Sequence, residues 1–180
     1  TPGTVSDYDI KPEYFEHIRA FADIKKPLNV VIDYANGMGI LEGGVFTDNM
    51  LNITPMYDEL DGTFPNHEAN PLDLHTLDAI SARLKQGGFD FGIAFDGDAD
   101  RAGFLDENGE VVTMDMITAL VAKAMLEKFP GSAIFYDLRS SWAVKEVIEE
   151  AGGRPMMSRV GHAFIKAQMR EADAVFAGEL

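Results

Sequence analysis

The stretch 91–104 places the tightest constraint on how this chain can fold. Its apolar first half ends at Asp96 and predicts a buried strand, and the apolar residues after Arg101 predict a second strand. Between the two, aspartates occupy the alternate positions 96, 98 and 100, and their spacers are one glycine and one alanine. Small spacers allow a tight backbone turn, so the stretch predicts a short loop in which three carboxylates converge.

Three carboxylates at such close range repel one another strongly unless a cation lies between them. Hard oxygen ligands in that number suit Mg²⁺, so we expect Asp96, Asp98 and Asp100 to form a magnesium site. Arg101 follows the third aspartate directly. A fixed positive charge beside a metal ion is what phosphoryl transfer requires, and the stretch therefore favours that class of chemistry.

Two other interpretations of this loop compete with a magnesium site. A solvated turn is the usual structure of Asp-Gly sequences, but it does not account for three alternating aspartates directly after an apolar strand. A calcium loop would use Asp96, Asp98 and Asp100 at its positions 1, 3 and 5, and Glu107 at position 12. Its position 6 must be glycine but is Arg101 here, and the flanks predict strands instead of helices, so we reject it.

Length, charge and composition narrow the class of protein. A chain of 180 residues can bury the core of one domain or of two small ones. Its formal net charge of −15 argues against nucleic acid and anionic membranes as partners. The absence of cysteine excludes disulfides and thiol chemistry, which fits a cytoplasmic protein. No stretch approaches the roughly 20 apolar residues that span a bilayer, and residues 1–6 lack a signal-peptide pattern.

Helical and strand patterns alternate along the chain, and this order predicts an α/β fold. We expect two consecutive units of mixed β-sheet covered by helices, residues 1–110 with the metal-binding loop and residues 111–180. Residues 1–9 are polar and predict a linker. Helices are expected at 11–26, 39–50, 72–86, 115–129, 141–151 and 161–171. Strands are expected at 28–34, 52–57, 91–96, 101–105, 110–113, 134–137, 156–160 and 174–177, with a hairpin turn at 106–109.

Polar residues at the ends of other predicted elements are further candidates. Arg139 follows a strand at the mouth of a helix, where α/β sheets place ligand-binding groups, although a surface salt bridge is an equal alternative. His162 follows Gly161 at a strand-to-helix turn, where the pKa range of a histidine suits proton transfer to or from a hydroxyl group; a structural hydrogen bond is the alternative. Asn66 and His67 are expected to anchor their long loop by hydrogen bonds.

Three further features are expected to be structural. The turn 36–39 is rich in glycine but lacks both phosphate-loop patterns. Lys166 lies one helical turn after His162 and is expected to be solvated. Ser140 or Ser141 is expected to cap the helix that follows it.

Five short motifs together resemble the α-D-phosphohexomutases, the phosphomannomutase/phosphoglucomutase family. The stretch Asp96-Gly-Asp-Ala-Asp-Arg101 looks like the metal-binding loop of that family. The other four motifs follow in the family's order and are Asp61-Gly-Thr-Phe-Pro-Asn-His67, Asp137-Leu-Arg-Ser-Ser141, Val160-Gly-His162 and Gly178-Glu-Leu180. The motifs span nearly the whole chain, and their common order argues against a chance match.

The resemblance implies a mutase mechanism. Members of the family pass a phosphoryl group from a phosphoserine on a separate N-terminal domain to a hexose phosphate, and back, through a bisphosphorylated sugar and with Mg²⁺. It also implies an activator of the glucose 1,6-bisphosphate type for the full-length enzyme. By resemblance, the metal ligands are Asp96, Asp98 and Asp100, the catalytic residues are Arg101, Arg139 and His162, and the substrate-binding residues are Gly161, His162, Gly178 and Glu179.

Parts of the family pattern are absent from this sequence. No serine lies in a Ser-His-Asn-Pro phosphoserine motif, and the sugar-recognition loop lacks its Ser-Gly-His half. We therefore expect domain 2 and most of domain 3 of a four-domain enzyme, inactive without its N- and C-terminal domains. A phosphorylated hexose is the expected ligand, and the stretch 61–67 favours glucose and mannose phosphates. A phosphoglucosamine mutase, or a non-catalytic metal- or sugar-phosphate-binding module, is the alternative.

Overall fold

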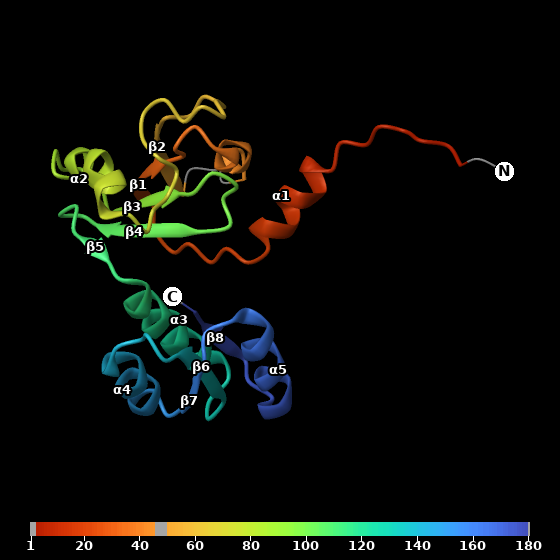
Figure 1. Ribbon diagram of the computed structural model, residues 1–180, viewed down its shortest axis with the longest axis vertical. Coiled ribbons are helices and arrows are strands. Elements are labelled where there is room, and N and C mark those ends of the chain that lie inside the picture. Colours follow the sequence, from red (N-terminus) through yellow and green to blue (C-terminus); the bar gives the residue numbers. More distant parts are fainter. Residues whose placement is uncertain (1–2, 46–49, 180) are drawn as a thin grey trace. The chain divides into compact units, whose positions relative to one another are not determined.

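The structure, a computed structural model, describes residues 3–45 and 50–179 (Figure 1). The chain divides into two compact units, residues 1–111 and 112–180. Within the described residues, the first unit contains a five-stranded sheet of order β2-β1-β3-β4-β5, and the second a three-stranded sheet of order β7-β6-β8. Helices accompany the strands in both units, which confirms the predicted α/β fold.

The first unit is built around the parallel strands β1 (Leu28–Asp33), β2 (Leu51–Met56) and β3 (Phe91–Phe95). β4 (Ala102–Asp106) pairs antiparallel with β3, and β5 (Val111–Val112) lies at the outer edge. The first sheet is therefore mixed, as predicted. β1 lies between two strands, and its residues 30–33 are buried. Since successive side chains of a strand point to opposite sides of the sheet, β1 contributes to the core on both faces.

Helices pack on the two faces of this first sheet. One face contacts the 3₁₀ helix η2 (Leu74–Leu77) and the α-helix α2 (Asp78–Leu84). The core on that side consists of Val31, Leu77, Ile80, Leu84, Ala94 and Leu105. The opposite face is approached by the 3₁₀ helix η1 (Met38–Glu42), whose Ile40 packs against it. The buried residues on that side are Val30, Ile32 and Tyr34.

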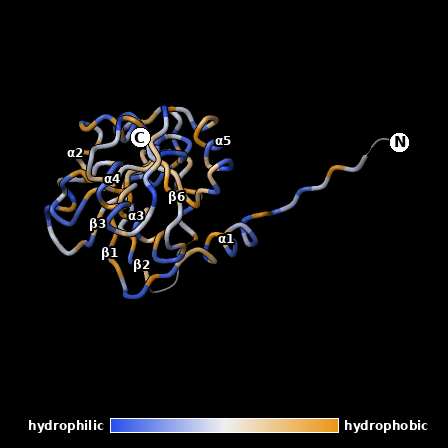
Figure 2. Tube along the Cα trace, turned by 90° about the horizontal axis from the view of Figure 1, so that it is seen from below, coloured by the Kyte–Doolittle hydropathy of each residue, from blue (hydrophilic) through white to orange (hydrophobic). Residues whose placement is uncertain are grey.

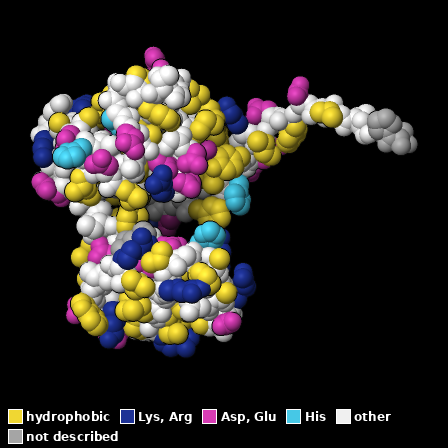
Figure 3. Space-filling view, viewed as in Figure 1, with side chains coloured by type: hydrophobic (Ala, Val, Ile, Leu, Met, Phe, Trp, Pro, Cys, Tyr) yellow, Lys and Arg dark blue, Asp and Glu magenta, His cyan; other side chains and the backbone are white. Residues whose placement is uncertain are grey.

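The helix α1 (Lys11–Arg19) precedes the sheet and buries none of its residues. Pro12 lies in its first turn, where the helix needs no N–H group from that residue. Arg19 Nη2 donates a hydrogen bond of 2.9 Å to the Gly44 carbonyl, which ties the end of α1 to the rest of the first unit. Hydrophobic side chains remain exposed along the preceding segment, among them Val5 and Tyr8 (Figure 3).

The second unit has β6 (Ala133–Asp137) as its central strand, paired in parallel with β7 (Arg154–Ser158) and β8 (Phe176–Gly178). All residues of β6 are buried. The chain alternates between hydrophobic and hydrophilic stretches along its length (Figure 2). The helices of this unit are α3 (Met114–Lys128), α4 (Trp142–Glu150) and α5 (His162–Ala172). The core consists of Ala119, Ala122, Leu126, Ile134, Tyr136, Val144 and Ile148.

The second sheet differs from the prediction of a mixed sheet, because all its described pairings are parallel. A helix separates each of its strands from the next, and such crossovers join parallel strands. β7 also begins two residues earlier than predicted. The Arg154 N–H donates 2.9 Å to the Ser132 carbonyl, and this long-range bond sets the start of pairing with β6.

Three predicted helices are shorter or tighter in the structure. The helix expected at 11–26 ends at Arg19, and the N–H groups of Phe21 and Ala22 bond to carbonyls three residues back instead of four. The helix expected at 39–50 is only η1 within the described residues, and positions 46–49 lie outside them. The helix expected at 72–86 starts as 3₁₀, because Thr76 Oγ1 bonds to the carbonyls of Asn70 and Asp73 at 2.8 and 2.7 Å.

Two local predictions about caps and turns have different outcomes. The hairpin turn at 106–109 is confirmed, since Gly109 has a φ of +76° and its N–H donates 3.0 Å to the Asp106 carbonyl. Ser141 is the N-cap of α4, but its side chain makes no capping bond; instead, Asp115 Oδ2 accepts the Ser141 N–H at 3.3 Å. Across residues 3–45 and 50–179, no helix combines the length and hydropathy needed to span a bilayer.

Candidate active site

The predicted metal-binding loop, residues 96–101, joins β3 to β4 at the carboxyl end of the parallel strands. Open α/β sheets bind ligands at this edge, because the loops of neighbouring strands meet there. Asp96 follows β3 directly and is 1% exposed. The strands on either side of the loop agree with the rejection of a calcium loop, which lies between two helices.

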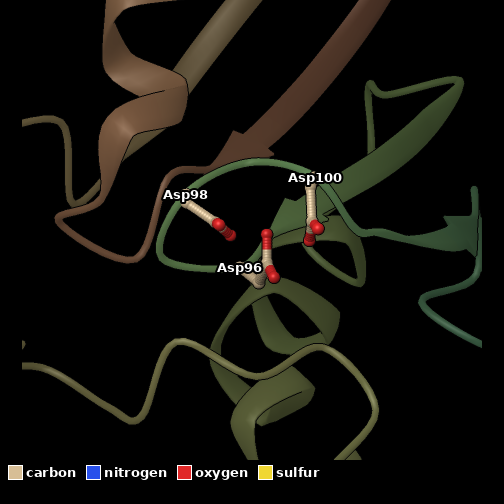
Figure 4. A group of neighbouring side chains, drawn as sticks. All are labelled: Asp96, Asp98 and Asp100. Atoms are coloured by element: carbon tan, nitrogen blue, oxygen red, sulfur yellow. The ribbon is translucent and has the colours of Figure 1, made fainter.

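The carboxylates of Asp96, Asp98 and Asp100 point toward one another (Figure 4). One oxygen from each lies within 4.8 Å of the others, with Asp96 buried and the other two exposed. Ligand oxygens lie about 2.1 Å from Mg²⁺, and therefore about 3 Å from adjacent and about 4 Å from opposite ligands. The three carboxylates, two of them on exposed side chains, are donors of the type and number that suit a hard divalent cation.

The backbone of the loop explains why the three carboxylates converge. Ala99 has a φ of 61°, in the left-handed region, and its N–H lies 3.3 Å from the Asp96 carbonyl. The Asp96 N–H donates 3.2 Å to the Arg101 carbonyl and closes the base of the loop. The chain therefore reverses direction within a few residues and returns over Asp96, which brings the later aspartates back to the first.

Arg101 binds the buried member of the aspartate triad. Its main-chain N–H donates to Asp96 Oδ1 at 3.1 Å, and its Nε donates to Oδ2 at 2.7 Å. Burial tends to raise the pKa of the Asp96 carboxyl, but the bonds from Arg101 outweigh it, and the pKa lies below its usual value. A hydrogen bond to Asp96 and the charge of Asp98 raise the pKa of Asp100. The triad carries more negative charge than one arginine neutralises, which favours a bound cation.

The long loop after β2 is anchored to the end of β1, as predicted. Asn66 Nδ2 donates to Asn36 Oδ1 at 2.8 Å. His67 Nε2 lies 3.0 Å from Oδ2 of Asp33, whose side chain is fully buried. Burial raises the pKa of Asp33, while the N–H of Ala35 and His67 act in the opposite direction. His67 therefore anchors the loop, because its ring nitrogen Nε2 is bound to the buried carboxylate of Asp33.

In the second unit, Arg139 folds back onto Asp137, the last residue of β6. Its main-chain N–H donates to Oδ1 at 2.8 Å, and its Nε and Nη2 donate to Oδ2 at 3.1 and 2.6 Å. The Asp137 side chain is 0% exposed and that of Arg139 is 43% exposed. Arg139 is therefore not part of a wholly solvated salt bridge: a buried carboxylate holds it at the carboxyl end of the central strand.

The structure brings Gly161 and His162 together with Glu179. Gly161, with a φ of 124°, is the N-cap of α5, and its N–H donates 2.7 Å to Glu179 Oε1. His162 is the first residue of α5 and is exposed, and its side chain makes no hydrogen bond or ion pair to the part of the chain that the structure describes. Lys166 is exposed on the same helix, in agreement with a solvated side chain.

Gly178 lies at the end of β8, against α3. A Cβ at this position would lie 2.2 Å from Thr118 Oγ1, so the close packing of strand and helix requires glycine. The local role of Gly178 is therefore to let the chain pass α3 and to lead into Glu179. Leu180, the last residue of the same motif, lies outside the described residues.

Two family profiles match nearly the whole chain. The profile described as phosphoglucomutase/phosphomannomutase, alpha/beta/alpha domain II, matches residues 12–109, and that of domain III matches residues 113–180. The chain belongs to the phosphoglucomutase/phosphomannomutase family. The resemblance expected from five short motifs is thereby confirmed over both units.

Relatives in the phosphoglucomutase/phosphomannomutase family are longer than this chain. The phosphoglucomutase of Neisseria gonorrhoeae and the phosphomannomutase/phosphoglucomutase of Pseudomonas aeruginosa are each 36% identical over 179 residues, 99% of this chain and 39% of theirs. The crystal structure of a family protein from Burkholderia thailandensis matches with a TM-score of 0.90 and 34% identity, over 96% of this chain and 38% of that one. The chain thus spans 38–39% of the length of these relatives.

Two buried aspartates were assigned no role from the sequence, although one of them, Asp137, begins one of the five motifs. Asp33 and Asp137 are both 0% exposed, and each ends an apolar strand, as Asp96 follows one. Asp33 anchors the loop after β2 through His67, and Asp137 holds Arg139. The signal that identified Asp96, an aspartate at the end of a buried strand, identifies both of these residues as well.

Proposed function

We propose that this chain is the metal- and sugar-binding middle of a mutase that interconverts hexose 1-phosphate and hexose 6-phosphate. Residues 1–110 are the proposed domain 2, and residues 111–180 an incomplete domain 3. The observation that carries the proposal is the convergence of three carboxylates beside Arg101, in a chain of the phosphoglucomutase/phosphomannomutase family. The names of the relatives support glucose and mannose phosphates as substrates.

In this proposal Asp96, Asp98 and Asp100 hold Mg²⁺, and the metal supplies charge that offsets the negative charge of a transferring phosphoryl group. The Arg101 side chain is 52% exposed, so its terminal nitrogens can bind a phosphoryl oxygen while Nε stays on Asp96. The proposed phosphoryl donor and acceptor is a phosphoserine in the part of the complete protein outside this chain. A bisphosphorylated hexose of the glucose 1,6-bisphosphate type is the proposed activator.

The second unit supplies the proposed sugar-binding groups. His162, exposed at the start of α5, gives a proton to a sugar hydroxyl or takes one from it. Glu179 accepts a hydrogen bond from another hydroxyl through the oxygen that does not bind the Gly161 N–H. Arg139, held by Asp137, adds positive charge toward a phosphorylated substrate.

Kinetics of the complete protein test this function. We expect Mg²⁺-dependent conversion of glucose 1-phosphate and mannose 1-phosphate to their 6-phosphates in the presence of glucose 1,6-bisphosphate. Asp98→Asn is expected to lose activity, whereas Glu107→Gln, an acidic residue beyond the loop, is expected to keep it. Exclusive use of glucosamine phosphates would instead assign a phosphoglucosamine mutase. No turnover of any hexose phosphate would refute the proposal in favour of a non-catalytic binding module.

A further inference from the structure

The turn that follows β1, residues 36–38, packs against the metal-binding loop without contributing a ligand (Figure 4). The Met38 N–H donates a hydrogen bond of 2.9 Å to the Gly97 carbonyl. A Cβ added to Gly37 would lie 2.7 Å from the same carbonyl oxygen and 3.2 Å from that of Asp96. The Gly97 carbonyl belongs to the peptide that leads to Asp98, so the turn sets the direction of the chain from one ligand to the next.

Gly97 is confined from a second side by the loop after β2. A Cβ on Gly97 would lie 3.2 Å from the Phe64 ring and 3.7 Å from Ala69 Cβ. The metal-binding loop therefore passes through a narrow space between the backbone of residues 36–38 and the Phe64 side chain. A shift of residues 36–38 or of the Phe64 side chain is therefore expected to move Gly97, the residue between the ligands Asp96 and Asp98.

The turn is itself held by four hydrogen bonds at Asn36, which is 6% exposed. Its N–H donates to the Tyr57 carbonyl at 2.9 Å, and its carbonyl accepts from the Asp61 N–H at 3.1 Å. Its side-chain Nδ2 donates to the Glu59 carbonyl at 2.8 Å, and its Oδ1 accepts from Asn66 Nδ2 at 2.8 Å. The loop after β2 thus fixes the position of residues 36–38, and these residues contact the metal-binding loop.

Strained backbone is concentrated in the same three loops. Among the described non-glycine residues, positive φ values in the loops that follow β1, β2 and β3 occur at Ala35, Asn36, Tyr57, Phe64 and Ala99. The remaining described example is Asp173, at the end of α5. Such conformations persist only where the surroundings over-determine them, and they cluster at functional sites.

We propose that residues 36–38 form a positioning element that holds the Gly97–Asp98 peptide, so that Asp96 and Asp98 face a common point before a cation binds. The inference rests on the proposed function, since it assigns Mg²⁺ to the three aspartates. Metal–ligand distances tolerate changes of about 0.2 Å. An alanine at position 37 must move the Gly97 carbonyl by more than that, because a contact of 2.7 Å is shorter than real Cβ contacts.

Mn²⁺ binding to the 180-residue chain, followed by electron paramagnetic resonance with Mg²⁺ as competitor, tests this positioning. Gly37→Ala is expected to weaken Mn²⁺ binding about tenfold, the lower end for groups that orient metal ligands. Gly62→Ala is the matched control, because a Cβ there meets open space, and it is expected to bind as the wild type. Ile80→Val, in the core, is expected to lower the Tm and leave Mn²⁺ affinity unchanged, which separates positioning from stability.

Asn66→Ala provides a second test if Gly37→Ala does not fold. It removes one hydrogen bond to Asn36 and is expected to weaken Mn²⁺ binding about threefold. Wild-type affinity in either folded variant would overturn the inference and leave the proposed metal site intact. Failure of the wild-type chain to bind either Mn²⁺ or Mg²⁺ would overturn the proposed function itself.

Discussion

Replacement of Arg101 by alanine separates two expected effects of its positive charge, namely repulsion of a metal ion in the resting site and stabilisation of a phosphoryl group during transfer. Its Nε lies 2.7 Å from Asp96 Oδ2 and 3.6 Å from Asp100 Oδ1. An ion about 2.1 Å from those oxygens lies roughly 5 Å from the guanidinium. A divalent and a monovalent cation at that distance, in water-like dielectric and physiological salt, repel by an amount that changes a binding constant about five- to tenfold.

Arg101→Ala is therefore expected to bind Mg²⁺ about five- to tenfold more tightly than the wild type. The same change is expected to lower turnover of the complete protein about 100-fold, the usual loss when one charge-stabilising donor is removed. The two effects have opposite signs, because the guanidinium repels the cation in the resting site and stabilises the phosphoryl group during transfer.

Calorimetric titration gives the Mg²⁺ affinity of the chain, and a coupled assay with glucose 1-phosphate gives kcat of the complete protein. Arg101→Lys is the matched control, because it keeps the positive charge and loses the planar donor group. We expect it to bind Mg²⁺ as the wild type and to turn over more slowly. If Arg101→Ala left turnover unchanged, the reasoning would be refuted, and Arg101 would only balance the charge of the loop.

Three further predictions concern the rest of the chain. The 180-residue chain is expected to bind Mg²⁺ weakly, and more weakly as Asp98→Asn, with only background turnover in a mutase assay, because none of its serines lies in the phosphoserine motif. Clear turnover, with host enzymes excluded, would contradict this. Gly178→Ala is expected to lower the free energy of unfolding by about 1–3 kcal/mol in urea, because its Cβ would lie 2.2 Å from Thr118 Oγ1; an unchanged midpoint is the opposite result. Hydrogen bonds, above all from Ser141, hold the pKa of Asp115 below its usual value. The stability that this carboxylate provides is therefore present above about pH 4 and is lost as the pH falls through its folded pKa. On acidification, the free energy of unfolding of Asp115→Asn is expected to fall less than that of the wild type. Equal decreases would argue against a stabilising role of the Asp115 carboxylate.

The metal-binding loop could be predicted because its signal is local. An apolar strand, alternate aspartates and small spacers together determine where the strand ends and how tightly the chain turns. Arg101 lies close enough in sequence to reach Asp96 by its own main-chain N–H. The same locality explains why the hairpin turn at 106–109 was predicted correctly, since Asp106 and Gly109 bond to each other.

Contacts between distant segments could not be predicted in this way. Gly161 and Glu179 lie 18 positions apart, and no local sequence pattern predicts that the Gly161 N–H donates to the Glu179 carboxylate. The prediction that the Ser141 side chain caps α4 was wrong for the same reason, because its hydroxyl hydrogen-bonds to Asp115, 26 positions earlier. The turn at Gly37 was predicted to be structural, but only the fold brings it against Gly97.

An aspartate paired with an arginine occurs at the end of a central strand in each unit. Asp96 and Asp137 are 1% and 0% exposed, and each accepts a main-chain N–H and Nε from the arginine that follows. A buried carboxylate is costly without such partners, so each aspartate fixes its arginine in place. The two arginines differ in which side-chain nitrogens bind the aspartate. Arg139 uses both Nε and Nη2 on Asp137, whereas the hydrogen bonds of the Arg101 side chain within the described residues use Nε alone. If the proposed function holds, the terminal nitrogens of Arg101 are therefore better placed than those of Arg139 to bind two oxygens of one phosphoryl group.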